Sequence, residues 1–140
     1  MRYAVKLTPL DHGDIMVTCP DLPELTSVGE SEADALHEAV DGIESTLVAY
    51  MLDRREIPEP RAAKRGQHEV PLPPLTVAKV GLYRAMLAQG LSKAALARRL
   101  GVPRPSVDRL LDLRHLSKLE QVQAALEAIG YRIELQVLAA

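Results

Sequence analysis

The 140-residue chain has few aromatic side chains and a single cysteine. Four Tyr with no Phe and no Trp leave aliphatic side chains to fill the core. The lone Cys19 excludes an intramolecular disulfide and fits a reducing compartment, and we expect it to be a buried, inert thiol. No apolar run approaches the roughly 20 residues that span a bilayer, and the N-terminus lacks the features of a signal peptide. We therefore expect a cytoplasmic protein with no membrane contact.

The sequence also lacks the patterns of common catalytic and metal sites. It has no CxxC pair and no glycine-rich phosphate loop. The four histidines are scattered and are expected to pair with no nucleophile: His12, His37, His68 and His115. A metal-dependent nuclease needs several carboxylates that converge on metal ions, and the spacing of Asp11, Asp14, Asp21 and Glu24 does not force convergence. We expect no enzyme activity, no metal and no cofactor.

The charges are divided unevenly along the chain. Residues 1–75 carry seven Lys/Arg and fourteen Asp/Glu, which gives −7, whereas residues 76–140 carry ten and five, which gives +5. Opposite charges in the two halves suggest different partners, a polyanion for the second half and something basic for the first. The alternative for the acidic half is a surface that only keeps the protein in solution.

The first half has the pattern of a small sheet followed by a helix. The β-prone runs Tyr3–Leu7 and Ile15–Cys19 flank the turn-rich PLDHGD and predict a hairpin, and PELTSVG continues as a short third strand. Ser31 is expected to cap a helix, with Asp34 as its capping-box partner. Steps of four and three predict one buried helical face. Its residues are Leu36, Val40, Ile43, Leu47 and Tyr50/Met51.

A proline-rich stretch predicts a domain boundary. Half of the ten prolines lie between Pro58 and Pro74, and proline fixes φ and removes a backbone donor. Within this stretch HEVPL, residues 68–72, is predicted to return to the first sheet as a fourth strand. We predict two domains, residues 1–74 and 75–140.

The second half has a helical period from Thr76 to about Gly130. Breaks at Gly90, at residues 101–105 and at residues 114–117 predict four helices. The following YRIELQVL predicts a strand, in which Tyr131, Ile133, Leu135 and Val137 alternate with mainly polar residues. Because a lone strand leaves backbone groups unpaired, we predict that it pairs with its copy in a homodimer or a higher even oligomer. The alternatives are that it folds onto its own helices or joins the N-terminal sheet.

The stretch LSKAALARRLGVPRPSVDRLLD, Leu91–Asp112, has the pattern of a helix-turn-helix. Ser92 is expected to cap its first helix, and Gly101 supplies the left-handed residue of a sharp turn. Ser117 and Glu120 predict a capping box for the next helix. An ordinary helical hairpin also favours glycine at its turn, but basic residues crowd this segment and favour DNA binding. They are Lys93, Arg98, Arg99, Arg104, Arg109, Arg114 and Lys118.

In such a motif the first residues of the second helix meet base edges in the major groove. Here these residues are Arg104, Pro105, Ser106 and Arg109, and arginine can bind guanine bidentately. Pro103 replaces the usual hydroxyl cap, whereas Pro105 lies in the first turn, where a missing N–H costs little. A second set is predicted to contact phosphate: Ser92, Lys93, Arg114 and Lys118.

The first half runs from a strand through a turn to a strand ending in Pro20–Pro23, and then through Thr26, Gly29, Ser31 and Ala35 into the helix. This order of elements and residues resembles the HicB antitoxin family. VPLPPLTVAKVGLYRAM followed by a helix-turn-helix is similar to the branch of that family that carries such a domain in place of a ribbon-helix-helix.

The resemblance implies an α+β chain, with a partial RNase-H-like βββαβ domain followed by an all-α helix-turn-helix domain with a terminal strand. It also implies that the protein neutralises a small basic mRNA-cleaving toxin, HicA, and represses their shared operon at a palindromic operator. Acidic residues can compete for an RNA-binding surface, and Asp14, Asp21 and Glu24 are our candidates for the toxin interface. The alternatives are a stand-alone transcription regulator that senses a small molecule and a metal-dependent nuclease.

Overall fold

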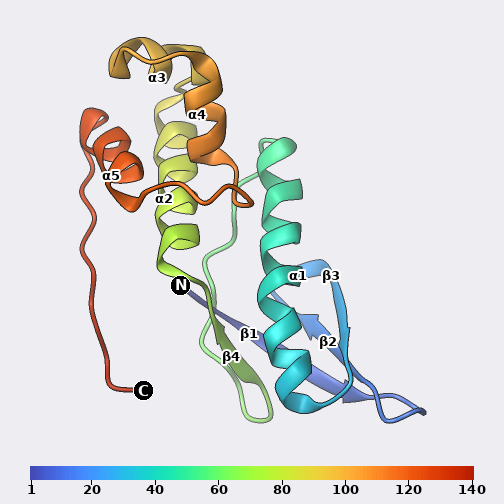
Figure 1. Cartoon of the computed structure of the whole chain (residues 1–140). Helices are drawn as coiled ribbons and strands as arrows, with labels where there is room; N and C mark the ends of the chain where they lie inside the picture. The colour runs from blue at the N-terminus through green and yellow to red at the C-terminus, as the bar shows by residue number, and fades with distance from the viewer. The chain divides into compact units, whose positions relative to one another are not determined.

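The computed structural model describes residues 1–140 and divides the chain into two compact units, unit 1 (residues 1–73) and unit 2 (residues 74–140). Unit 1 holds all four strands and one helix, and unit 2 holds four helices (Figure 1). This mixed content confirms the α+β class. None of the five helices combines the length and the hydropathy needed to cross a bilayer.

Unit 1 is built on a four-stranded antiparallel sheet. Its strands are β1 (Arg2–Pro9), β2 (Ile15–Cys19), β3 (Leu22–Gly29) and β4 (His68–Pro71), in the order β3-β2-β1-β4. The predicted hairpin and third strand are confirmed, and the residues HEVP form the predicted fourth strand, next to β1. β4 is thus the edge strand beside β1, and it completes the sheet before the chain enters unit 2.

Helix α1 (Glu32–Leu52) covers one face of this sheet (Figure 1). The Ser31 Oγ accepts a hydrogen bond from the N–H of Asp34 at 3.1 Å, which confirms the predicted cap. The Asp34 carboxylate accepts from the N–H of Glu30 at 2.8 Å. One unsatisfied donor of the helix, the N–H of Asp34, and the N–H of Glu30 just before the cap are therefore paired at its N-terminus.

The first half of α1 approaches the sheet more closely than its periodicity indicates. Leu36 and Val40, which we predicted to be buried, are half-buried, and the smaller Ala35 and Ala39 are fully buried in their place. A Cβ added to Gly29, at the end of β3, would lie only 2.3 Å from the backbone nitrogen of Ala35. Glycine there lets the helix backbone come near the strand, so small residues face the sheet.

Residues 53–67, which follow α1, have no regular secondary structure. The Tyr3 hydroxyl donates to the Pro58 carbonyl at 2.7 Å, and the Arg61 N–H donates to the Asp21 carboxylate at 2.9 Å. These contacts attach the irregular segment to β1 and to the turn between β2 and β3.

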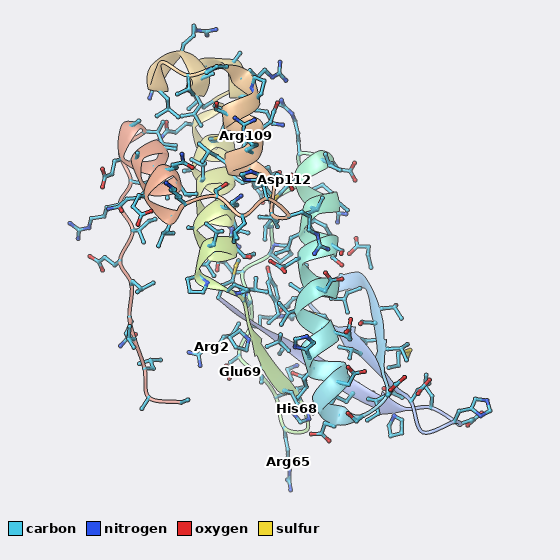
Figure 2. The ribbon with its side chains drawn as sticks, viewed as in Figure 1. Arg2, Arg65, His68, Glu69, Arg109 and Asp112 are labelled. Carbon is cyan, nitrogen blue, oxygen red and sulfur yellow. The ribbon has the colours of Figure 1, made fainter.

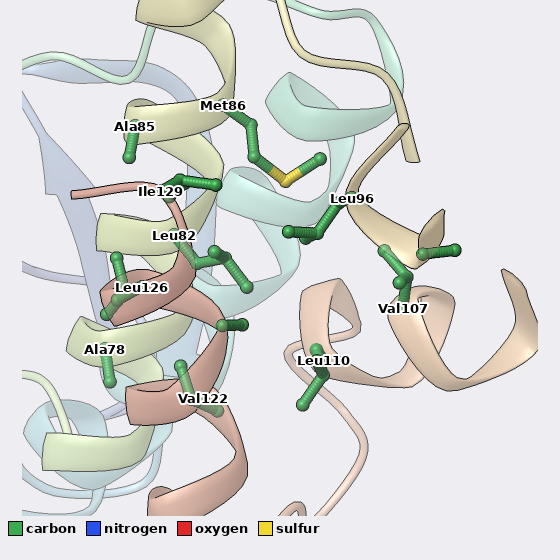
Figure 3. Packing of buried hydrophobic residues seen from close by; sticks show 12 residues of the cluster. Ala78, Leu82, Ala85, Met86, Leu96, Val107, Leu110, Val122, Leu126 and Ile129 are labelled. Carbon is green, nitrogen blue, oxygen red and sulfur yellow. The ribbon is translucent and has the colours of Figure 1, made fainter. Parts of the chain in front are cut away.

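Unit 2 contains the four predicted helices, α2 (Pro74–Gln89), α3 (Lys93–Leu100), α4 (Arg104–Leu111) and α5 (Leu119–Ala128). Each contributes a fully buried aliphatic side chain to one core cluster (Figure 3). These side chains are Leu82, Leu96, Val107 and Val122. Because α3 and α4 are only eight residues long, this shared core rather than helix propensity must hold them in place.

The predicted C-terminal strand is wrong for the single chain. Residues 131–140 have no regular secondary structure (Figure 1). Ile133 packs against the core cluster of unit 2, whereas Tyr131, Leu135 and Val137 are 44%, 63% and 86% exposed. Unit 2 contains no strand, so the backbone N–H and C=O groups of this segment have no neighbouring strand with which to pair. Pairing with a second chain stays a prediction.

The predicted capping box of α5 is also wrong. The N-cap is Lys118, and no side chain caps the helix. The Ser117 hydroxyl instead donates to the Arg109 carbonyl at 3.3 Å and lies 2.9 Å from Nδ1 of His115. Ser117 therefore hydrogen-bonds to the end of α4 and does not cap the start of α5.

Candidate nucleic-acid and protein interfaces

Helices α3 and α4 are joined by the tight turn that the sequence predicts. The Ser92 Oγ accepts a hydrogen bond from the N–H of Ala95 at 3.1 Å. Gly101 ends α3 in the left-handed conformation, with φ 66° and ψ 34°, which a side chain would strain. Pro103 is the N-cap of α4 without a side-chain hydrogen bond, and Pro105 lies in the first turn. These local predictions are confirmed.

The four residues predicted to read bases lie at the start and on one side of α4. Arg104, Pro105 and Arg109 are exposed, and Ser106 is half-buried. The Arg109 guanidinium donates to the Ser106 Oγ at 3.3 Å, which brings these two side chains together. Leu110 and its neighbours on the opposite side of α4 pack into the core (Figure 3). The structure thus places two guanidinium groups on the accessible side of this helix.

The residues predicted to contact phosphate form two pairs. Ser92 and Lys93 begin α3, where the Lys93 ammonium lies 2.9 Å from the carboxylate of Asp108 on α4. Arg114 and Lys118 are exposed in the segment between α4 and α5. The Asp108 contact partly neutralises Lys93, so Lys118 is a stronger candidate for phosphate than Lys93.

Sequence reasoning missed Lys79, which lies in α2 and is only 1% exposed. Its Nζ donates to the backbone carbonyls of Arg109 at 2.9 Å, Asp112 at 2.7 Å and His115 at 2.7 Å. Burial lowers the pKa of this ammonium group, and the negative charge of Asp112 opposes that effect. The signal in the sequence was a single charged residue inside the apolar stretch LTVAKVGLY.

Two of the three predicted toxin-binding carboxylates lie at opposite ends of β2, so they form no single site with each other. Asp14 is half-buried before β2, and its carbonyl accepts from the N–H of Leu10 at 2.7 Å. Asp21 follows β2, and its side chain is only 6% exposed and bound to Arg61. Burial alone would raise the pKa of Asp21, but the backbone N–H and the guanidinium of Arg61 lower it.

The third of these carboxylates, Glu24, also has partners within unit 1. The Tyr50 hydroxyl donates to Glu24 at 2.7 Å, and the Arg55 guanidinium donates at 3.1 Å while lying 3.8 Å from the centre of the Tyr50 ring. The hydrogen bond from Tyr50, with smaller help from Arg55, lowers the pKa of Glu24. Asp21 and Glu24 therefore bind the last turn of α1 and the irregular segment that follows it.

A broader acidic surface lies on α1. This helix carries five acidic residues and no Lys or Arg, and all five are exposed or half-buried: Glu32, Asp34, Glu38, Asp41 and Glu44. Five of the seven Lys/Arg of residues 1–75 lie within residues 54–65. Residues 1–53 alone therefore carry two basic and eleven acidic residues, a net charge of −9.

The histidines, the carboxylates and the cysteine can be compared with the arrangements that catalytic and metal sites require. The expectation that no histidine lies beside a nucleophile is wrong, because His115 is paired with Ser117. The Ser117 hydroxyl is only 8% exposed and donates to a backbone carbonyl, which makes the pair structural. No group of three or more His, Cys, Asp or Glu side chains is arranged to hold a metal ion. Cys19 is buried as predicted, and burial raises the pKa of its thiol.

Comparisons with known proteins cover both units. Residues 2–81 match the family model described as HicB_like antitoxin of bacterial toxin-antitoxin system. Antitoxin HicB of Pseudomonas fluorescens (strain Pf0-1) is 47% identical over 140 residues, which cover 99% of this chain and 95% of that protein. Antitoxin HicB of Escherichia coli (strain K12) is 36% identical over 96% of this chain and 98% of its own length. Antitoxin HicB 1 of Photorhabdus laumondii is 35% identical over 98% of this chain and 87% of its own. The chain therefore belongs to the HicB-like family of antitoxins of bacterial toxin–antitoxin systems.

Proposed function

We propose that unit 1 binds and neutralises a small mRNA-cleaving toxin of the HicA type, and that unit 2 binds operator DNA and represses the operon of the pair. The observation that carries this proposal is the separation of charge between two compact units. Unit 1 has a net charge of −7 and unit 2 of +5. Both partners, the toxin and the operator, place this function in the cytoplasm, and neither role requires the antitoxin to be an enzyme.

The surface of α1 is the part of unit 1 best suited to a basic partner. A toxin that binds mRNA needs a basic surface, and acidic side chains on α1 have the same sign of charge as RNA. Asp21 and Glu24 already bind residues of unit 1, so changing them alters the fold as well as the surface. Glu38 is exposed on α1 and provides a cleaner test of the electrostatic contribution.

The α4 helix is the part of unit 2 best suited to the major groove. Arg104 and Arg109 are exposed on it and have the donor geometry that recognises guanine. Arg114 and Lys118 follow in the next segment, where they can bind the sugar–phosphate backbone. A single motif of this size covers a short half-site, so we infer that a dimer binds two half-sites about 34–36 Å apart.

Co-expression with the product of the adjacent gene, if that gene encodes a short basic protein, tests the proposal. We expect the two proteins to co-purify and the growth arrest caused by the partner to be relieved. The charge reversal Glu38→Lys should weaken this association in a salt-dependent manner, whereas Arg104→Ala, in unit 2, should leave it unchanged. A full-length chain that neither binds the partner nor restores growth would contradict the proposed antitoxin role.

A further inference from the structure

Two of the three buried polar side chains of this protein bind the backbone at the end of α4. Only Thr76, Lys79 and Ser117 are buried among the polar and charged residues, and all three belong to unit 2. Lys79 and Ser117 donate to the same acceptor, the carbonyl of Arg109. Arg109 is also one of the two arginines proposed to read bases. Two buried side chains therefore donate to the backbone carbonyl of a residue that is proposed to contact DNA. Figure 2 shows the positions of Arg109 and of Asp112 in the ribbon.

Lys79 acts as a C-terminal cap that is supplied by another helix. The last four carbonyls of a helix have no partner within it, and cations are favoured at this end. Lys79 donates to Arg109 in the last turn of α4, to the C-cap residue Asp112, and to His115 in the next segment. An ammonium group has three N–H donors, and here each has a carbonyl acceptor.

Stability alone does not explain a lysine at this position. An ammonium group loses its hydration when it is buried, and apolar residues often replace buried charges without loss of stability. The Asp112 carboxylate accepts from the N–H of Arg114 at 2.9 Å, and the three acceptors of the Lys79 ammonium group are backbone carbonyls rather than a carboxylate. Unlike an apolar side chain, the ammonium group requires its three acceptors at fixed distances and directions. It therefore fixes the end of α4 and residues 112–115 relative to α2.

We propose that Lys79 is a positioning residue for operator recognition, which sets the register between the base-reading side chains of α4 and the phosphate-binding Arg114 and Lys118. The proposal rests on the proposed DNA-binding function of unit 2. Lys79 does not touch DNA, because it is buried. Its effect comes through Arg109, whose carbonyl it holds, and through residues 112–115. Recognition of bases tolerates little displacement, since supporting contacts must hold such side chains to within about 0.5 Å.

The variant Lys79→Met removes the charge and keeps an unbranched side chain. All exposed basic residues remain, so affinity for random DNA and the salt dependence of binding should change less than about twofold. Operator affinity should fall at least about tenfold, because the geometry of base contacts is lost. Fluorescence anisotropy with operator and random duplexes of equal length measures both. An equal loss on the two duplexes, or no loss on either, would overturn the proposal.

Chemical rescue separates the ammonium group from the shape of the side chain. Lys79→Cys is made together with Cys19→Ala, so that position 79 holds the only thiol. Alkylation of the unfolded chain gives either an aminoethyl thioether, which restores the ammonium group at nearly the same length, or an uncharged propyl thioether. After refolding, only the aminoethyl form should regain preference for the operator. A propyl form with the same preference would show that filling the space is sufficient.

Amide hydrogen exchange provides a test that does not depend on DNA. Lys79→Met should lower protection at the end of α4, around Arg109 and Asp112, while protection of α5 stays unchanged. If the wild-type chain binds no operator, the proposed function of unit 2 fails, yet this measurement still tests the role of Lys79. Unchanged protection at the end of α4 would contradict that role.

Discussion

Replacement of Asp21 by Asn is predicted to destabilise unit 1 by about 1.5–2 kcal/mol. The Asp21 side chain is 6% exposed and accepts hydrogen bonds from the N–H and the Nε of Arg61. A hydrogen bond to a charged group contributes about 1.5–3 kcal/mol, and Asn keeps one acceptor oxygen, so the equivalent of one such bond is lost. The Arg61 side chain is 70% exposed, and solvent screening of that partner favours the lower part of the range. Asn also presents an NH₂ donor where the carboxylate presents a second acceptor.

The effect of Asp21→Asn should depend on pH. Arg61 lowers the pKa of Asp21 in the folded state, despite the opposing effect of burial. The ionised carboxylate therefore contributes its full stabilisation above its ordinary pKa of about 3.9, and this contribution is lost as the pH falls through the lower folded-state value. Urea unfolding at pH 7 and at decreasing pH, followed by NMR signals of β2 and α5, measures the two units separately.

Asp14→Asn is the matched control for this prediction. Asp14 lies at the other end of β2 and is half-buried, so its replacement should change stability by less than about 0.5 kcal/mol. The reasoning is refuted if Asp21→Asn also stays within that limit at pH 7, or if its effect persists below the folded-state pKa. A variant of Asp21 that keeps its stability but loses toxin binding would make this residue an interface contact rather than a structural one.

Three further predictions concern unit 2. Arg104→Ala and Arg109→Ala should each cost about 1–3 kcal/mol of operator binding and relax preference at one base position, whereas Lys118→Ala should weaken all DNA equally and reduce the salt slope by about one; equal losses on operator and random DNA for the arginine variants would exclude base reading. Leu96→Ala, at a fully buried position, should destabilise unit 2 by about 2–5 kcal/mol in urea unfolding, and a loss under 1 kcal/mol would contradict the packing of α3. Deletion of residues 131–140 should give monomers by sedimentation and weaken operator binding while toxin binding persists; a dimer that survives places the interface in the helices.

Features with a local physical cause could be predicted from the sequence. The bounds of β2, the caps at Ser31 and Ser92, and the turn at Gly101 each depend on a few adjacent residues. Alternation, capping hydroxyls and glycine in the left-handed region act within one or two turns of chain. The return of β4 to the sheet was also predicted, because a short β-prone run stands out among prolines.

Features set by distant contacts could not be predicted. The buried face of α1 depends on Gly29, whose lack of a side chain brings Ala35 against β3. Ser117 had the spacing of a capping box, but the Arg109 carbonyl, eight residues earlier, binds its hydroxyl. Lys79 is 30 to 36 residues from its acceptors, so no local pattern connects them. The strand predicted from alternation beyond Gly130 failed in the single chain because alternation does not supply a neighbouring strand.

Neither could the roles of the acidic candidates be predicted. In the sequence, Asp21 and Glu24 are acidic residues that could belong to an interface. In the structure Asp21 is bound by Arg61, 40 residues away, and Glu24 is bound by Tyr50, 26 residues away. The sequence showed that the first half is acidic, but it did not show that acidic residues form a surface on α1. The buried positions of α1 had to be known before the exposed ones could be assigned.

Whether unit 1 alone neutralises the toxin can be measured as the affinity of the toxin for a fragment ending at Leu75, compared with its affinity for the full chain. This fragment keeps β4 and all acidic residues of unit 1. Isothermal titration calorimetry at each of several salt concentrations should give dissociation constants for the fragment and the full chain that agree within about threefold. This corresponds to a difference in binding free energy of under about 1 kcal/mol. Both should weaken as salt increases, because opposite charges bring the proteins together. A folded fragment that fails to bind while the full chain binds would contradict the assignment of toxin neutralisation to unit 1.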